Sequence, residues 1–121
     1  MAFNLTDKMV NEAYRAGEFL HAEANGTLSR ERIVIVSGAG VLNAGTVLGK
    51  ITASGKYKAY SDAASDGSQT AAGILYASVD ATSADASGVM IARHAEVVQA
   101  ALTGIDAAGK TDLAAVQIIF R

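Results

Sequence analysis

The sequence predicts a mainly β protein: a small β domain that carries one short helix and follows an extended N-terminal arm. After Arg32, short β-branched runs alternate with Gly- and Ser-rich turns at the regular spacing typical of small barrels and folded ribbons. Before Arg32 the chain is polar, rich in Glu and Arg, and holds only isolated large apolar residues. We therefore expect residues 1–31 to form a flexible arm and residues 32–121 to form the β domain, with no core residue before Arg32.

The composition fits one small domain that has little stability in reserve. Half of the 121 residues are apolar, but alanine supplies much of that half and buries little surface. The chain has no cysteine, so neither a disulfide nor a thiolate–metal site compensates. Association with other chains is the remaining common source of stability for such a domain.

Charge and hydropathy exclude several classes of partner. The formal net charge of −2 argues against nucleic acid, whose binding needs a strongly basic surface. No apolar run approaches the roughly 20 residues of a membrane-spanning helix, so no membrane is expected. The first residues do not show the charged and apolar regions of a signal peptide, and we expect none.

The arm is predicted to begin with a short helix over Thr6–Ala16, with Thr6 as its N-cap and Gly17 just past its end. The segment Gly17–Ala22 is then expected to be extended. Because it contains no proline, its backbone groups are expected to be free to pair with a strand of a partner.

The β domain is predicted to start with Ile33–Val36, whose continuous apolar run is typical of a strand buried on both faces. The remaining expected strands, one of them with a bulge at Gly49, are Thr46–Ile51, Tyr57–Tyr60, Gly73–Tyr76, Val89–Arg93, Ala95–Val98 and Ile118–Phe120. Val89–Arg93 is expected to continue into or pair with Ala95–Val98. A single helix is expected over Thr111–Val116, capped by Thr111.

Two glycine-rich stretches resemble nucleotide-binding loops without meeting their requirements. Val34–Gly40 lacks the helix that would bind a pyrophosphate, and Gly45–Lys50 is one residue short of a phosphate loop, with Ile51 at the magnesium-binding position. Neither His21 nor His94 has another ligand at a metal-site spacing. No catalytic residue, cofactor or metal site is therefore expected, and the chain is not predicted to be an enzyme.

Five pieces, in order along the chain, carry a likeness to a known family: Tyr14–Leu20, Glu23–Glu31, Ala44–Lys50, Ala63–Leu75 and Ile118–Arg121. The likeness they carry extends over nearly the whole chain. In this order they resemble the head decoration proteins of lambda-type bacteriophages. One departure is that Gly104–Val116 is shorter than in many relatives, so we expect its helix to be a single turn.

The resemblance implies a capsid-stabilising protein with a β-clip-like body. Such a protein sits as a homotrimer at local three-fold sites on the outside of the expanded icosahedral head. There it binds the major capsid protein and resists the pressure of packaged DNA. It implies a virion location, with assembly in the host cytoplasm. The arm would bind the capsid, with Phe19 and Leu20 as apolar anchors; the candidate residues are Tyr14, Arg15, Gly17, Glu18, Phe19, Leu20, Glu23 and Ala24.

Two other classes of protein remain open on sequence grounds. A biotinyl- or lipoyl-type carrier domain would present a lysine at a hairpin tip, and Lys56 and Lys58 lie near a predicted turn. The methionines that flank carrier lysines are absent from these positions. A trimeric adhesin or fibre-tip module would bind a receptor instead of a capsid.

Overall fold

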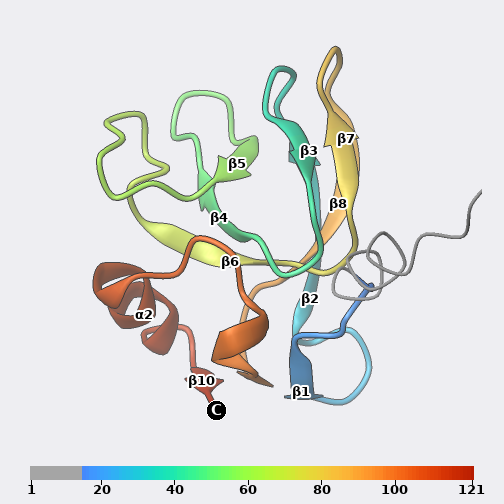
Figure 1. The fold of residues 1–121 in the computed structure, drawn as a ribbon, viewed down its shortest axis with the longest axis vertical. Coiled ribbons are helices and arrows are strands. Elements are labelled where there is room, and N and C mark those ends of the chain that lie inside the picture. The colour runs from blue at the N-terminus through green and yellow to red at the C-terminus, as the bar shows by residue number, and fades with distance from the viewer. Residues whose placement is uncertain (1–14) are drawn as a thin grey trace, which may run out of the picture.

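The computed structural model describes residues 15–121 and is mainly β, as predicted (Figure 1). The strands are β1 (Leu20–Glu23), β2 (Arg30–Ile35), β3 (Gly40–Leu42), β4 (Val47–Lys50), β5 (Tyr57–Ala59), β6 (Ala71–Leu75), β7 (Val79–Ala81), β8 (Ala86–Ile91), β9 (Ala95–Val97) and β10 (Ile118–Phe120). One helix, α2 (Ala107–Ala114), and a short 3₁₀ turn, Gln99–Ala101, complete the described elements.

Three β units make up the described part of the molecule. Five strands close a barrel in the order β2-β5-β4-β6-β8, which agrees with the small barrel expected from the strand spacing. A three-stranded sheet, β1-β9-β10, lies below the barrel in the view of Figure 1, beside α2. The two-stranded ribbon β3-β7 extends from the opposite end.

Two hydrophobic cores hold these units together. The first fills the barrel with residues from all five of its strands, including Ile35, Leu48 and Leu75. The second lies between the barrel wall, the three-stranded sheet and α2; its buried members are Phe19, Val47, Tyr60, Ala71, Ile74, Ile91, Ala95, Val97, Leu113 and Ile118.

Strands β4, β6 and β8 belong to both cores because successive side chains of a strand point to opposite faces. The consecutive pairs, with one member in each core, are Val47 and Leu48, Ile74 and Leu75, and Ile91 and Met90. Strand β2 is different: Ile33 and Ile35 are buried, whereas Val34 is 40% exposed. The prediction that this strand is buried on both faces is therefore wrong.

The pairing around β9 differs from the prediction. β9 lies between β1 and β10 and does not pair with β8, because His94 adopts a positive φ of 50° and turns the chain out of the barrel. The strands β3 and β7 were not expected; each is three residues long, and they pair with each other.

The helix α2 begins earlier than predicted. Its N-cap is Asp106, whose Oδ1 accepts a hydrogen bond from the Gly109 N–H at 2.7 Å. The prediction that Thr111 caps the helix is wrong: the Thr111 hydroxyl donates to the carbonyl of Ala107 at 3.1 Å inside the helix. With eight residues, α2 also exceeds the single turn that we expected.

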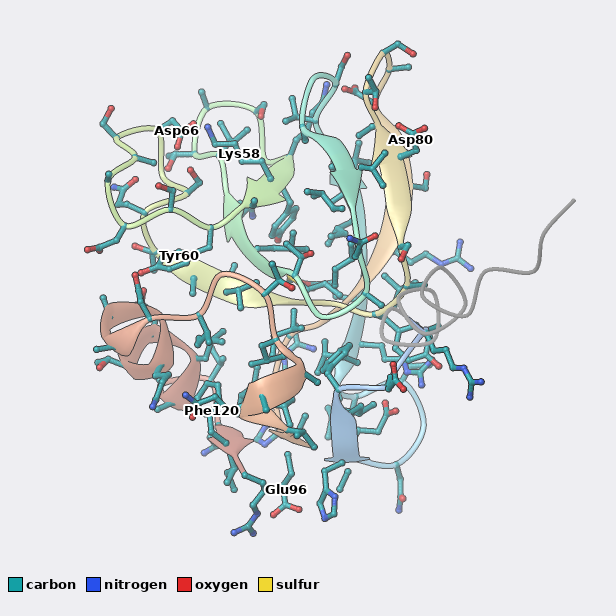
Figure 2. The ribbon with its side chains drawn as sticks, in the orientation of Figure 1. Lys58, Tyr60, Asp66, Asp80, Glu96 and Phe120 are labelled. Carbon is teal, nitrogen blue, oxygen red and sulfur yellow. The ribbon has the colours of Figure 1, made fainter. Side chains whose placement is uncertain are left out.

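The bulge expected at Gly49 is confirmed by a register shift between Leu48 and Gly49 in the β4–β6 pairing. A Cβ atom on Gly49 would lie 2.5 Å from the carbonyl oxygen of Ser68, so the loop over β4 needs a glycine there. The Ser68 hydroxyl donates to Asp66 at 2.6 Å, and Asp66 pairs with Lys58 at 2.6 Å (Figure 2). These contacts fix the loop that precedes β6 against the barrel.

Candidate functional site

Apart from Tyr14, the residues predicted to contact a partner lie at the start of the described chain, in the segment Arg15–Ala24, which we call the root segment. It crosses the body as a turn followed by β1. The Gly17 N–H donates to the carbonyl of Tyr76 at 2.8 Å. Gly17 has a φ of +70°, and a Cβ atom there would lie 2.8 Å from the Tyr76 ring, so only glycine fits without strain.

Phe19 is a core residue and not a free anchor. Its side chain is 1% exposed and lies in the second core, while its carbonyl accepts from the Val98 N–H at 2.7 Å. The prediction that no core residue precedes Arg32 is therefore wrong. Phe19 packs there with residues of the barrel wall, of the three-stranded sheet and of α2. Leu20 is half-buried and packs against the same core.

Ser29 is a second buried residue before Arg32, with none of its surface exposed. Its hydroxyl donates to the carbonyl of His94 at 2.9 Å and accepts from the Ala24 N–H at 3.0 Å. These bonds connect the end of the root segment to the turn that leads into β9. The connection explains why the chain up to Ser29 follows the body.

Arg30, Glu23 and Tyr76 form a cluster beside the root segment. The Arg30 guanidinium makes two hydrogen bonds to the Glu23 carboxylate, at 3.0 and 2.9 Å, and lies 4.2 Å from the centre of the Tyr76 ring. Hydrogen bonding to Arg30 holds the pKa of Glu23 below its usual value. A forked, stacked contact of this kind suits arginine and joins the end of β1 to the start of β2.

The structure brings together only part of the predicted site. Gly17 and Glu23 meet in the Arg30–Tyr76 cluster, whereas Phe19 points into the core. Arg15 and Glu18 are exposed, and Ala24 is half-buried. Tyr14 lies outside the described residues, as does the predicted Thr6–Ala16 helix apart from its last two residues.

Arg30 and Tyr76 were not among the predicted site residues. Tyr76 lies far from the root segment in sequence, and Arg30, although seven residues from Glu23, lies on a different strand, so no periodic spacing indicated either residue.

One edge of β1 is open. In the three-stranded sheet β1 is the outer strand, with β9 on one side and no strand on the other among the residues described. The expectation that the backbone of Gly17–Ala22 is unpaired is therefore wrong for the edge facing β9. An open strand edge presents N–H and C=O groups to which a further strand can add.

Other candidate chemistry is sparse within residues 15–121. No group of three or more His, Asp or Glu side chains there is placed to hold a metal ion. The two lysines considered for a carrier domain are both in ion pairs: Lys56 lies 2.6 Å from Asp85, and Lys58 lies 2.6 Å from Asp66. No helix in the described part of the chain is long and apolar enough to cross a membrane.

The fold and the root segment together define a small β-barrel protein with an open strand edge suited to association. The chain belongs to the family of the bacteriophage lambda head decoration protein D, whose family model matches residues 9–118. The comparison with curated proteins gives no match. This family consists of structural capsid proteins and is not a family of enzymes, so the chain is a viral protein that binds a phage capsid.

Proposed function

We propose that the protein binds the expanded phage head as a homotrimer at local three-fold sites and reinforces the shell against the pressure of packaged DNA. Its partner is the major capsid protein, and it joins the outer surface of the capsid in the host cytoplasm. Membership of the head decoration family over residues 9–118 is the observation that carries this proposal. The open edge of β1 supports it, because that edge gives a capsid strand a place to pair.

The structure suggests separate roles for the residues of the root segment. The backbone of β1 and the exposed side chains Arg15 and Glu18 face outward, and we assign the capsid contact to them. Phe19 and Glu23 hold the strand in place, one in the core and the other through Arg30. The segment 1–31 thus acts as the capsid-binding arm, although its described second half is packed on the body.

A trimer would present three root segments to the shell at once. After one segment has bound, the other two bind at a high effective concentration, so three modest contacts give firm attachment. A small loss at each contact is therefore multiplied in the attachment of the whole trimer.

Co-sedimentation with expanded empty heads tests this proposal, with Glu18→Lys compared with Asp62→Lys. Both residues are exposed, and both substitutions change the charge by the same amount. We expect Glu18→Lys to weaken binding several-fold, because it reverses a charge at the edge of the contact. Asp62→Lys should bind like the wild type, and both variants should melt like the wild type.

Cryo-microscopy of the decorated heads completes the test. We expect three copies around each local three-fold axis and continuous density between the β1 edge and the capsid protein. Wild-type protein that stays in the supernatant would refute capsid decoration. Two or four copies at each site would refute the trimer alone, and equal binding by Glu18→Lys would refute the contact that we assign to the root segment.

A further inference from the structure

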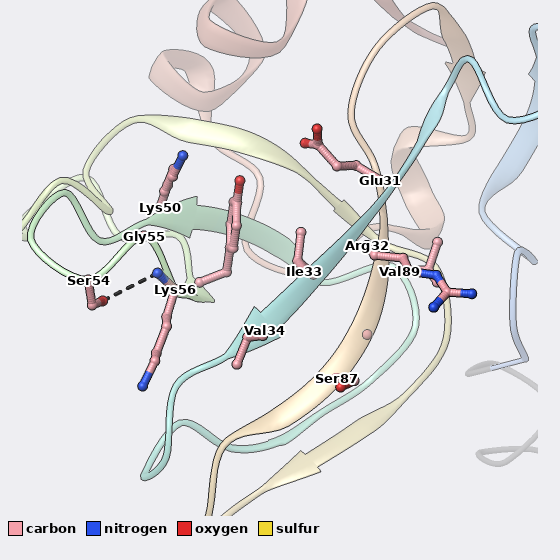
Figure 3. Close-up of a pocket in the computed structure, with 12 residues that line it drawn as sticks. Glu31, Arg32, Ile33, Val34, Lys50, Ser54, Gly55, Lys56, Ser87 and Val89 are labelled. Atoms are coloured by element: carbon pink, nitrogen blue, oxygen red, sulfur yellow. Dashed lines mark hydrogen bonds between the residues drawn. The ribbon is translucent and has the colours of Figure 1, made fainter.

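The barrel is closed by a single narrow contact between β2 and β5. These strands share one register pair, Ile35 with Tyr57, next to a hydrogen bond of 2.9 Å from the Val36 N–H to the Tyr57 carbonyl. Elsewhere β2 has a strand partner on one side only, β8. The open part forms a groove of about 790 Å³ between β2 and the β4–β5 hairpin, which we call the seam groove (Figure 3).

The backbone of β2 presents hydrogen-bonding groups to the seam groove. The Ala92 N–H donates to the Ser29 carbonyl at 2.8 Å, so Ser29 and Ala92 form a hydrogen-bonded pair. The pairs Ile33–Gly88 and Arg32–Val89 follow in the same antiparallel register. Peptide groups of successive residues point to opposite sides of a strand. It follows that Ile33 bonds to β8, whereas Arg32 and Val34 point their peptide groups away from β8. This is the edge to which an extended segment can add.

Two positive charges lie along the same groove. Arg32 on β2 and Lys50 at the end of β4 are both among the residues that line it, and both are exposed; in the view of Figure 3 they lie on opposite sides of β2. Within the described chain neither has a carboxylate at ion-pair distance; the Lys50 ammonium lies 6.0 Å from the Tyr57 ring. Val34, 40% exposed, adds an apolar side chain to the lining of the groove.

The other charged residues of the groove are already paired. Glu31 lies 3.4 Å from Arg93, and Lys56 lies 2.6 Å from Asp85. The charged groove residues without an ion-pair partner in the described chain, Arg32 and Lys50, are therefore both positive. An occupant with carboxylates would complement it, whereas a basic occupant would be repelled.

We propose that the seam groove binds an extended, carboxylate-bearing segment of the major capsid protein, which adds to the edge of β2 and pairs with Arg32 and Lys50. This rests on the proposed capsid-binding function and adds a second contact to that of the root segment. The two contacts are neighbours, because Arg30 at the start of β2 bonds to Glu23 at the end of β1.

A second copy of the described chain fits the seam groove less well than an acidic capsid segment. All four carboxylates on its strands are already engaged: Glu23 with Arg30, Glu31 with Arg93, Asp80 with Thr82, and Glu96 with Arg121. A neighbouring copy that added one of its strands to the groove would have to break one of these contacts for that strand to supply a carboxylate.

The first experiment is co-sedimentation of Arg32→Glu and Lys50→Glu with expanded empty heads, over a series of salt concentrations. Lys110→Glu is the matched control, because Lys110 on α2 also lacks a carboxylate partner in the described chain and lies away from the groove. We expect each groove variant to bind about tenfold more weakly than the wild type and to show less salt dependence. The control should bind normally.

Melting curves verify that each variant folds. If Arg32→Glu or Lys50→Glu does not fold, the corresponding glutamine variant, Arg32→Gln or Lys50→Gln, is used in its place. Normal binding by the folded groove variants would overturn the seam contact and leave the proposed function standing. Wild-type protein that fails to bind heads would overturn both proposals.

The second experiment is hydrogen exchange of the wild-type protein, alone and bound to heads. The Arg32 and Val34 amides should exchange fast in the free protein and become protected on the heads, whereas Ile33 should be protected in both states. If Arg32 and Val34 are instead protected in the protein alone, increasingly so with its concentration, a second copy fills the groove. That result would overturn the assignment to the capsid protein.

Discussion

The Tyr60 hydroxyl donates a hydrogen bond of 2.8 Å to the carboxylate of Asp106, the N-cap of α2 (Figure 2 labels Tyr60 beside the helix). The same carboxylate accepts from the Gly109 N–H. A second carboxylate, that of Asp112, accepts from the Ala71 N–H at 2.9 Å at the start of β6. Two acidic side chains therefore hold the short helix α2 on the barrel by hydrogen bonds. These bonds matter because Gly109 and Leu113 are the buried residues of that helix.

Replacing Asp106 tests this fastening. We expect Asp106→Ala to lower the melting temperature, because the N-cap and the bond to Tyr60 are both lost. Asp106→Asn keeps an acceptor for the Gly109 N–H and should melt closer to the wild type. Burial, with Asp106 nearby, raises the pKa of Tyr60 to about 12, so its hydroxyl keeps the donated proton near neutral pH.

The effect of Asp106→Ala should depend on pH. The Gly109 N–H and the Tyr60 hydroxyl lower the pKa of Asp106 from its usual 3.8. Its stabilising effect is then full above pH 3.8 and is lost as the pH falls through the lower folded-state value. Melts of both proteins from neutral pH down to about pH 2 should show the gap between them closing only at the acid end. A gap that stays constant would contradict this role of the carboxylate.

Phe19→Ala should destabilise the whole domain. Its ring is fully buried in the second core, and truncating a buried Phe typically costs about 3–5 kcal/mol in free energy of unfolding. Urea titration measures this cost. Leu20→Ala is the neighbouring control; since Leu20 is only half-buried, we expect a clearly smaller loss. Equal, small effects would mean that Phe19 contributes no more to the core than a surface residue.

Two truncations should separate the root segment from what precedes it. A variant that starts at Arg15 keeps every described contact, including those of Gly17 and Phe19, and should melt cooperatively like the full chain. A variant that starts at Ser29 loses β1 and leaves β9 unpaired on one side, so its melt should broaden or disappear. Circular dichroism measures both. A normal melt of the shorter protein would show that the root segment is dispensable for folding.

Gly49→Ala should be much more harmful than Gly88→Ala. A Cβ atom on Gly49 would lie 2.5 Å from a backbone oxygen of Ser68, whereas one on Gly88 would meet a methyl group of Val79 at 3.2 Å. A side-chain methyl can move by a few tenths of an ångström, but the carbonyl belongs to a fixed loop. The melting temperatures of the two variants test this prediction. A similar decrease in melting temperature for both variants would contradict it.

The sequence predicted the fold class because the strands have strong local signals. Ile33–Ile35, Tyr57–Ala59 and Ile118–Phe120 are apolar or alternating runs bounded by turn residues, and the structure has strands there. The bulge at Gly49 was also indicated locally, by a glycine within an apolar run. The short strands β3 and β7 were missed because three residues carry too little periodicity to distinguish a strand from a loop.

The position of Phe19 could not be predicted from local pattern. A single aromatic residue in a polar stretch indicates either a partner contact or a core contact, and the choice depends on which surface the rest of the fold leaves uncovered. The cluster of Arg30, Glu23 and Tyr76 was missed for a similar reason, since its members meet only once β1, β2 and the turn after β6 are in place. The N-cap of α2 was misplaced because Ala107–Lys110 lacks an apolar stripe.

The three strands shared between the two cores have a mechanical consequence. A pull on the chain at Arg15 is first resisted by the bond from Gly17 to Tyr76 and then by the Phe19 ring in the second core. That core shares β4, β6 and β8 with the interior of the barrel, so the load passes into the barrel wall and not into an isolated edge strand. We therefore expect tension on this segment to spread over most of the domain before any strand separates.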